Sequence, residues 1–443
     1  MLKKRKKSTN KILFYTSMER ERHIEDLKKI ASLSKNKKNV KTQKQRNLLG
    51  KNVITAIKGI GCRPDKVFYK PSTNFSVNGS LSNKKGLRKI GKGEMGEVFL
   101  GCVDKECKKP VAIKVSNGSN RYEYKIGKRI EKLSGMRMYA YQECVNEKNK
   151  KYSIIYTEFA NSGTLSSFIK NNINTLRPIH LRTIVTHVLF NLYRIHKKYP
   201  SFRHHDLHTE NILISTNVKS TGIRRFKVDD TVLKVHDIGI EASLNDFGFS
   251  SINGIPNPEI DSGDYKRKHG IYRESNYMYD VHYFLNSLRH FLKGEKILSG
   301  QETIQFIERV LPPDYLGMVT YKVSDFRLRM SPIGHDKLPT FNQIFKDRYF
   351  SPYREKKQEL SKVLNIIGRA APIKPKSIIV KHGGNPAPPK VSLSKKGYVK
   401  IGTRKCYSYK KGELVKIANI LNVPTKNKTI SKICQDLKLK YIK

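Results

Sequence analysis

The chain of 443 residues has no tryptophan, few cysteines and no long apolar stretch. No window approaches about 18 consecutive apolar residues, so no segment is expected to span a membrane. The basic N-terminus, MLKKRKKSTN, is not followed by the apolar stretch that a signal peptide needs. The six cysteines include no C-x-x-C pair. A zinc site or a disulfide framework is therefore not expected, and a reducing compartment is the simpler interpretation.

Acidic residues are scarce, and the imbalance is concentrated at the two ends of the chain. Lysine and arginine number 88 against 37 aspartate and glutamate, which gives a formal net charge of +51. Basic residues outnumber acidic ones by 21 to 5 in residues 1–83 and by 18 to 2 in residues 372–443. Such segments favour DNA or another polyanion as a partner, because each neutralised phosphate releases counterions. The alternative is a pair of solvated arms without a dedicated partner.

Composition and periodicity divide the chain into five segments. Within the first, a polar helix is expected over residues 17–31, and the rest of residues 1–50 is expected to be disordered. The segments are a basic, partly disordered extension (1–83), a strand-rich part (84–160), a helix-rich part (161–369), a Pro/Gly linker (370–395) and a small basic helical module (396–443).

A glycine-rich stretch, Gly91-x-Gly93-x-x-Gly96-x-Val98, lies between two strand-like runs. Glycine lets the backbone approach phosphate oxygens closely and present N–H donors that a Cβ would obstruct. Because a strand and not a helix follows, a dinucleotide-binding turn is disfavoured. The stretch indicates a loop that covers the phosphates of a nucleotide.

Lys114, in VAIK, follows this stretch at the distance expected for the next strand but one. A buried lysine there can bind the α- and β-phosphates of ATP if a carboxylate holds it. Glu123 and Glu131 both lie on the helix predicted over residues 121–134. Glu123 lies roughly 60° from the centre of the apolar face and Glu131 about 145° away, so Glu123 is the better partner.

The stretch HHDLHTENIL places Asp206 where it can accept a hydroxyl proton and Asn211 where it can hold Mg²⁺. A second metal-binding carboxylate must follow. Asp246, in NDFGFSS, is preferred over Asp237, in HDIGI, because IEASLN predicts a strand before it. The separation of 35 residues between Asn211 and Asp246 then implies an inserted hairpin.

These four motifs, in this order, resemble those of the eukaryotic-type protein kinase superfamily over about residues 84–350. The resemblance implies an α+β, two-lobed fold, with an N-lobe over 84–160 and a C-lobe over 161–369, and ATP and Mg²⁺ as cofactors. It implies three catalytic residues and two metal ligands. Asn211 belongs to both sets, and Lys114 is also a nucleotide-binding residue. The catalytic residues are Asp206, Lys114 and Asn211, and the metal ligands are Asn211 and Asp246.

The same resemblance implies a set of nucleotide-binding residues, and Asp280 as the support of the catalytic loop. Thr157 would be the gatekeeper, and the backbone of Glu158 and Ala160 would face adenine. The full set is Ile90, Gly91, Lys92, Gly93, Glu94, Met95, Gly96, Glu97, Val98, Ala112, Lys114, Glu123, Thr157, Glu158 and Ala160.

Two narrower resemblances concern the origin of the chain and its C-terminus. The stretch GIYRESNYMYDVHYFLNSL is similar to Ser/Thr kinases of large cytoplasmic DNA viruses, iridoviruses especially. This implies a protein substrate and a location in the host cell cytoplasm or the virion. Residues 409–441, read as two short helices around a Val-Pro-Thr turn, resemble a SAP-type DNA-binding module. The alternative is a helical hairpin that docks on the kinase body.

Two residues of the catalytic stretch depart from the family pattern. His205 replaces an arginine that tunes activation, and His208 replaces a lysine, which weakens the contact to the γ-phosphate. "DLH" is also similar to small-molecule kinases of the aminoglycoside and choline phosphotransferase type. The alternatives to a Ser/Thr protein kinase are therefore such a phosphotransferase, or a catalytically silent, kinase-like scaffold that binds nucleic acid.

Overall fold

The computed structural model divides the chain into two compact units, residues 1–378 and 379–443, which are described separately. The structure describes residues 21–27, 43–59, 61–70, 87–93, 96–216, 222–262, 273, 275–316, 338–354, 391–393, 399–401, 404–406, 414, 418 and 429–441.

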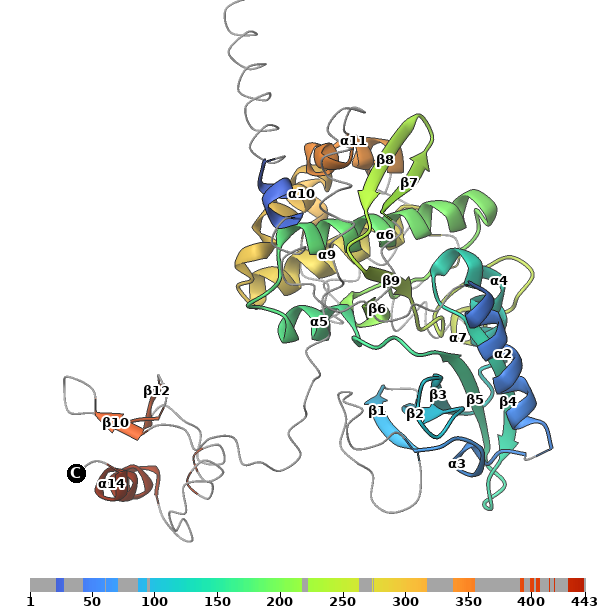
Figure 1. The fold of residues 1–443 in the computed structure, drawn as a ribbon, viewed down its shortest axis with the longest axis horizontal. Helices are drawn as coiled ribbons and strands as arrows, with labels where there is room; N and C mark the ends of the chain where they lie inside the picture. Colours follow the sequence, from blue (N-terminus) through green and yellow to red (C-terminus); the bar gives the residue numbers. More distant parts are fainter. Residues whose placement is uncertain are drawn as a thin grey trace, which may run out of the picture. The chain divides into compact units, whose positions relative to one another are not determined.

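A five-stranded antiparallel sheet forms the strand-rich part of the first unit (Figure 1). Its strands lie in the order β1-β2-β3-β5-β4, and apolar residues of β3 and β5 alternate inward as a half-buried strand requires. The strands are β1 (Arg88–Lys92), β2 (Gly96–Cys102), β3 (Pro110–Asn117), β4 (Met138–Val145) and β5 (Lys151–Glu158).

Helix α4 (Arg121–Ser134) has the predicted bounds and packs its apolar stripe inward. Tyr122, Ile126 and Ile130 recur every four residues, so they share one face, and all three are buried. The helix ends at Gly135, whose φ of 84° is the left-handed conformation that favours glycine after a helix. This helix delivers one carboxylate of the candidate site described below.

The helix-rich part is built around α6 (Pro178–Lys198), a long helix with most of its side chains buried. Pro178 opens the helix, where its missing N–H costs nothing, and basic residues fill the last turn. The prediction of an α+β fold with a strand-rich and a helix-rich part is confirmed. The other helices are α5 (Leu165–Asn171), α7 (Pro258–Asp261), α9 (Tyr279–Gly294), α10 (Gln301–Val310) and α11 (Phe341–Lys346), with 3₁₀ turns at Thr209–Asn211, Leu298–Gly300, Pro313–Tyr315 and Arg348–Tyr353.

Two small antiparallel pairs of strands frame the middle of the chain. β6 (Ile212–Thr216) pairs with β9 (Ile240–Leu244), and the hairpin of β7 (Ile223–Val228) and β8 (Thr231–His236) is inserted between them. This is the inserted hairpin that the spacing before Asp246 predicted. Because β6 and β9 are adjacent, the segments that follow the catalytic stretch and precede Asp246 lie side by side.

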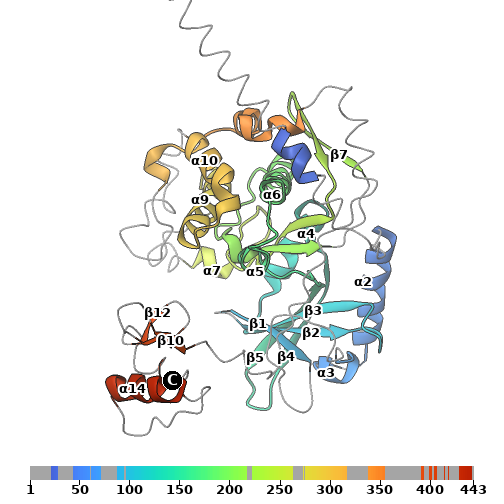
Figure 2. The same ribbon diagram turned by 60° about the vertical axis from the view of Figure 1, so that its left-hand side comes forward.

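The N-terminal extension is more ordered than expected. Helix α2 (Gln43–Ile57) covers part of a range expected to be disordered, and it runs along edge strand β4 (Figures 1 and 2). Leu49 and Val53, four residues apart, are buried in an apolar cluster together with residues of the sheet. The sequence expectation was wrong here because two apolar residues on one face suffice to dock a mostly polar helix. Short helix α3 (Pro64–Val67) follows, and residues 21–27 are helical, within the predicted range 17–31.

All six cysteines are paired, which contradicts the expectation that the chain has no disulfide framework. The pairs are Cys62–Cys144, Cys102–Cys107 and Cys406–Cys434. The first joins the segment after α2 to β4 across 82 residues, with a Cα–Cα distance of 5.9 Å. Sequence spacing gave no sign of this pairing, because it is the packing of the extension on the sheet that brings these two residues together.

The second unit combines strands with a helix, whereas only helices were predicted. β10 (Val391–Leu393), β11 (Val399–Ile401) and β12 (Arg404–Lys405) form an antiparallel sheet, and β10 lies inside the predicted linker 370–395. Helix α14 (Ile430–Tyr441) matches the second predicted helix; the first lies outside the described residues except for two positions. The buried cluster of this unit contains Val399, Ile401, Cys406, Leu414, Ala418, Ile433, Cys434 and Leu437.

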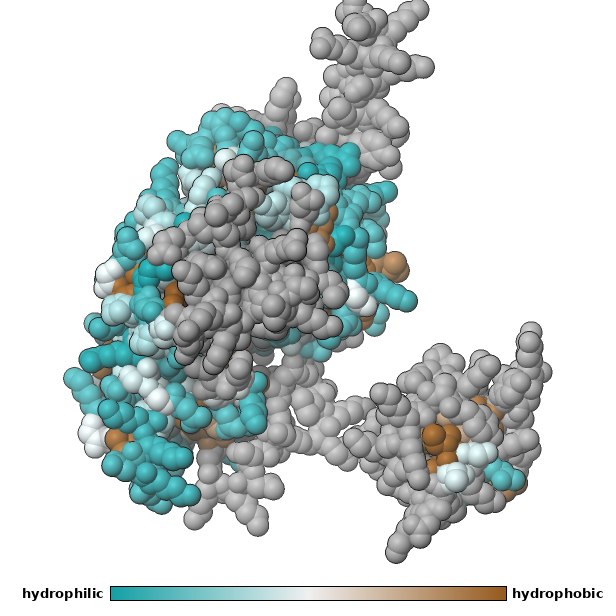
Figure 3. Space-filling model, turned by 180° about the vertical axis from the view of Figure 1, so that it is seen from behind, coloured by the Kyte–Doolittle hydropathy of each residue, from teal (hydrophilic) through white to brown (hydrophobic). Residues whose placement is uncertain are grey.

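On the face shown in Figure 3, the described residues present mainly hydrophilic side chains. In the view of Figure 3, hydrophobic side chains appear only as small separate patches between hydrophilic ones. Among the helices of the described residues, none has both the length and the apolar character needed to cross a bilayer.

Candidate active site

A cavity of about 530 Å³ lies beneath β1 and β2, between the sheet and the segments around β6 and β9. Apolar residues of β1, β2, β3 and β5 form one wall, and polar residues that follow the catalytic stretch form the other. Of the predicted nucleotide-binding residues, those that line the cavity are Ile90, Gly91, Lys92, Gly93, Val98, Ala112, Lys114, Glu123, Thr157, Glu158 and Ala160.

The glycine-rich turn roofs this cavity only in part. Gly93 N–H donates to Gly96 O (2.8 Å) and closes the turn, while Glu94 and Met95 lie outside the described residues. Gly96 and Glu97 are not among the lining residues. A Cβ on Gly96 would come within 2.2 Å of Val115 O, so this glycine allows β2 to approach β3.

Lys114 lies at the centre of the site and contacts two carboxylates. Its Nζ donates to Glu123 Oε1 (2.7 Å) and to Asp246 Oδ1 (3.0 Å). Glu131, the rejected alternative, instead accepts from Lys128 Nζ (3.1 Å) and from the N–H of Met138 (3.2 Å). The pairing with Glu123 agrees with the helix-face argument, because Glu123 is on the buried border of α4.

Burial and charge compete at this cluster. Burial alone would lower the pKa of Lys114, but Asp246 and Glu123 outweigh it and raise that pKa above its ordinary value. Burial raises the pKa of Glu123, against the opposing effect of Lys114. Burial also acts to raise the pKa of Asp246, yet the Lys114 ammonium holds it below its usual range. Lys114 is therefore a fixed cation in a water-poor site.

Asp246 follows β9 as the sequence indicated, with a φ of 61° that is rare for a non-glycine residue. Phe247 packs beneath α4 at Gly127, where a Cβ would come within 2.9 Å of its ring. Asp237, the other candidate, is buried elsewhere and pairs with Arg224 at 2.9 Å. Among the two carboxylates, only Asp246 lines the cavity.

Asp206, Asn211 and His208 form a hydrogen-bonded group at the cavity's edge. Asn211 Nδ2 donates to Asp206 O (2.8 Å) and Oδ2 (3.2 Å). The Oδ1 atom of Asn211 takes no part in these two hydrogen bonds. His208 Nε2 lies 3.4 Å from Asp206 Oδ2. Asn211 lines the cavity. Asp206 does not line it, but the hydrogen bond from Asn211 Nδ2 places Asp206 next to the cavity.

The backbone before Asp206 is held by Asp280 of α9. The N–H groups of His204 and His205 donate to the two oxygens of Asp280 at 2.7 and 2.9 Å. His205 has a φ of 65°, and its Nε2 contacts Ser251 Oγ at 3.0 Å. Burial lowers the pKa of His205 to about 3, so this side chain is neutral where many kinases carry a cationic arginine.

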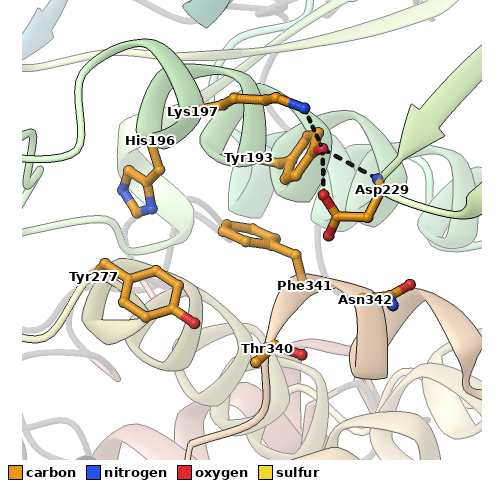
Figure 4. Close-up of a pocket in the computed structure, with 8 residues that line it drawn as sticks. All are labelled: Tyr193, His196, Lys197, Asp229, Tyr277, Thr340, Phe341 and Asn342. Carbon is orange, nitrogen blue, oxygen red and sulfur yellow. Dashed lines mark hydrogen bonds between the residues drawn. The ribbon is translucent and has the colours of Figure 1, made fainter.

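A second hollow, shown in Figure 4, is lined by residues of α6, of the segment before α9 and of the start of α11. His196 of α6 is at its inner end, 4.0 Å from Asp280, with the rings of Tyr193, Tyr277 and Phe341 around it. Burial lowers the pKa of His196 to about 3. This hollow therefore lies near Asp280 through His196 and shares no lining residue with the main cavity.

The segment after β5 supplies the remaining wall. The N–H of Glu158 donates to Arg137 O (2.9 Å), and the Glu158 carboxylate pairs with Arg46 of α2 at 3.0 Å. Several lining residues were not predicted, because their apolar or small polar character resembles that of any core or loop residue. The unpredicted lining residues are Met138, Ile155, Phe159, Asn161, Ser162, Gly163, Thr164, Ser167, Glu210, Leu213, Asn245 and Phe247.

Comparison with known proteins gives this arrangement a family. Residues 85–256 match the family described as protein kinase domain. A stretch of 176 residues is 32% identical to a protein of Acanthamoeba polyphaga mimivirus whose provisional name is serine/threonine-protein kinase. The aligned stretch covers 38% of this chain and 38% of that protein. Residues 85–256 are therefore similar to a protein kinase domain, the α+β fold agrees with the two-lobed fold of that family, and part of the chain is similar to a viral protein named as such a kinase.

Proposed function

We propose that the chain is a protein kinase that transfers the γ-phosphate of ATP to Ser/Thr hydroxyls. The observation that carries the proposal is that Lys114, Asn211 and Asp246, far apart in the chain, line one cavity, with Lys114 in contact with Asp246 and Asp206 hydrogen-bonded to Asn211. The family match and the name of the mimivirus relative support the same reaction.

The residues present suit Mg²⁺ and a triphosphate. Asn211 Oδ1 and the Asp246 carboxylate are hard oxygen ligands, the type that Mg²⁺ prefers. Among the described residues there is no group of three or more His, Cys, Asp or Glu side chains that could hold a metal alone. Two protein oxygens fit an ion that takes its other ligands from phosphates and water, as in kinases. Bound Mg²⁺ would neutralise charge on the transferred phosphoryl group.

Each protein group has a role that its surroundings allow. Lys114, kept charged by Glu123, binds the α- and β-phosphates, and the glycine-rich turn covers them with backbone N–H groups. Asp206 orients the attacking hydroxyl and accepts its proton. His208, whose Nε2 lies beside Asp206, takes the position of the usual lysine and offers a hydrogen bond toward the transferred phosphate.

The test is phosphate transfer from labelled ATP to Ser, Thr and Tyr peptides, with choline and an aminoglycoside as further acceptors. Asp206→Asn is expected to lower kcat by about 10²- to 10⁴-fold, the usual contribution of a catalytic base. Asp65→Asn, which changes an exposed carboxylate of α3, should leave kcat unchanged. Equal signal from wild type and Asp206→Asn would support the catalytically silent scaffold. Turnover of the small molecules alone would support a small-molecule phosphotransferase.

The proposal extends to a protein substrate and, for a viral enzyme, to action in the host cell cytoplasm or virion. The charge of +51 supports contact of the basic flanks with DNA or another polyanion. This partner is part of the proposal, and the family match concerns residues 85–256 alone.

A further inference from the structure

A basic hollow of about 310 Å³ lies away from the catalytic cavity. It is formed where the end of α4, the middle of α6, the β7 hairpin strand and β9 meet α2, elements that lie close together in Figure 1. Its cationic lining residues come from four of these elements and the segment after α4. They are Arg46, Lys132, Arg137, Arg194, Arg224 and Arg225.

Three of these cations are neutralised by carboxylates. Arg46 pairs with Glu241 (2.6 Å) and Glu158 (3.0 Å). The other two pairs in the hollow are Arg224 with Asp237 (2.9 Å) and Arg137 with Glu131 (3.9 Å).

The remaining three cations, Lys132, Arg194 and Arg225, have no carboxylate partner among the described residues. Arg194 donates to the carbonyl of Lys132 (3.3 Å) and stacks over the ring of Phe190, 5.8 Å from its centroid. These contacts hold the guanidinium at the hollow without cancelling its charge. The hollow thus has an excess of positive charge that the protein does not balance locally.

A buried, unpartnered polar atom lies in the same hollow. His187 is 6% exposed and lines it, and His187 Nδ1 has no hydrogen-bond partner among the described residues. Burial keeps this ring neutral at ordinary pH, because it lowers the His187 pKa to about 4. A neutral imidazole can donate one hydrogen bond to an anion. A buried polar atom without a partner costs stability, which a ligand can recover.

We propose that this hollow binds the phosphate monoester of a phosphorylated Ser or Thr side chain in a peptide. A phosphomonoester carries nearly two negative charges and three acceptor oxygens, which match three uncompensated cations and one imidazole donor. The cations surround one small hollow and do not form a track, which favours a single phosphate over a nucleic-acid backbone. The hollow joins α2 and α4 to α6, so an occupant contacts elements of both lobes.

The test is fluorescence polarisation with a labelled peptide of Gly, Ala and Ser, with or without one phosphoserine, and with no ATP added. Without ATP, the outcome is independent of whether the chain is a kinase. Wild type should bind the phosphorylated peptide about tenfold more tightly, as expected for charge-assisted hydrogen bonds. The double variant Arg194→Ala, Arg225→Ala should lose this preference. The charge-matched control Arg121→Ala, Lys125→Ala, on the exposed side of α4, should keep it.

Thermal melting by circular dichroism checks that both double variants are folded. Equal affinity for the two peptides, or an equal loss in the control variant, would overturn the proposal. A mixed-sequence single-stranded oligonucleotide serves as a competitor. If it binds more tightly than the phosphopeptide and displaces it, and if its affinity falls in Arg194→Ala, Arg225→Ala, the hollow binds nucleic acid instead. Displacement by inorganic phosphate only at concentrations far above that of the peptide is the expected result, because the peptide adds its own contacts.

Discussion

Lys114 shows how single residues set the chemistry of this site. It is a buried cation, and it stays charged because Glu123 and Asp246 both lie within hydrogen-bonding distance. Removing one partner of such a cluster leaves a buried charge without compensation, which costs more than the pair itself contributes. Glu123 is predictable from its place on the helix face, whereas the direct contact to Asp246, 132 residues away, depends on the tertiary fold.

His208 makes the site sensitive to pH. Burial acts to lower the His208 pKa, but the hydrogen bond to Asp206 and its charge raise it above the ordinary value. A group whose pKa rises on folding stabilises the folded state below its unfolded pKa, and that contribution is lost as the pH rises through the folded pKa. We expect His208→Gln to lower the free energy of unfolding by about 1 kcal/mol near pH 5.5 and by less near pH 9.

Urea unfolding of wild type and His208→Gln across this pH range measures the difference directly. A difference that stays constant or grows as the pH rises would contradict the predicted interaction with Asp206. His208→Lys serves as the control, because a lysine stays charged over most of the range and should flatten the dependence.

Helix α2 illustrates what is decided at the scale of elements. The helix is mostly polar, so the two apolar residues that pack it against β4 do not stand out in the sequence. Arg46, near its start, pairs with Glu158 and Glu241. Strong periodicity, as in α4, allowed the bounds of an element to be predicted from sequence. Helix α2 is held by a few tertiary contacts, and β10 is a short strand of mixed polar and apolar residues. In both cases tertiary packing determines the structure, so the local sequence is not sufficient to predict it.

Neighbouring leucines of α2 provide a matched test of this docking. Leu49 is 3% exposed and Leu48 is 52% exposed. Leu49→Ala is expected to lower the free energy of unfolding by about 2–4 kcal/mol, because it removes buried methyl groups and leaves a cavity. Leu48→Ala should change it by less than about 0.5 kcal/mol. Equal effects of the two substitutions in denaturant unfolding would show that α2 does not pack on the sheet in this register.

At the scale of the whole molecule, covalent links and charge add constraints that no single motif reveals. Two disulfides lie in the unit of residues 1–378 and one in the unit of residues 379–443. The kinase match covers residues 85–256, and basic residues are concentrated outside it. The role of these basic flanks, including any binding of DNA, stays a prediction.

The pairing of all cysteines can be measured on the intact chain. Denatured protein prepared without reductant should titrate with no free thiols, and six should appear after reduction. Loss of the Cys62–Cys144 link, which closes a long loop, should lower the free energy of unfolding by about 2–4 kcal/mol. The double variant Cys62→Ser, Cys144→Ser isolates this link from the other two. Six reactive thiols before reduction would restore the expectation of free cysteines.

In the proposed mechanism, Lys114 and Asp246 act together on one magnesium-bound triphosphate. A double-mutant cycle on kcat/KM for ATP, with Lys114→Met, Asp246→Asn and the combined variant, tests it most directly. Each single substitution is expected to lower kcat/KM by about 10²-fold or more, and the combined variant by little beyond that, because residues of one catalytic unit have strongly non-additive effects. Wild-type values for either single variant, or losses that multiply in the combined one, would contradict the account.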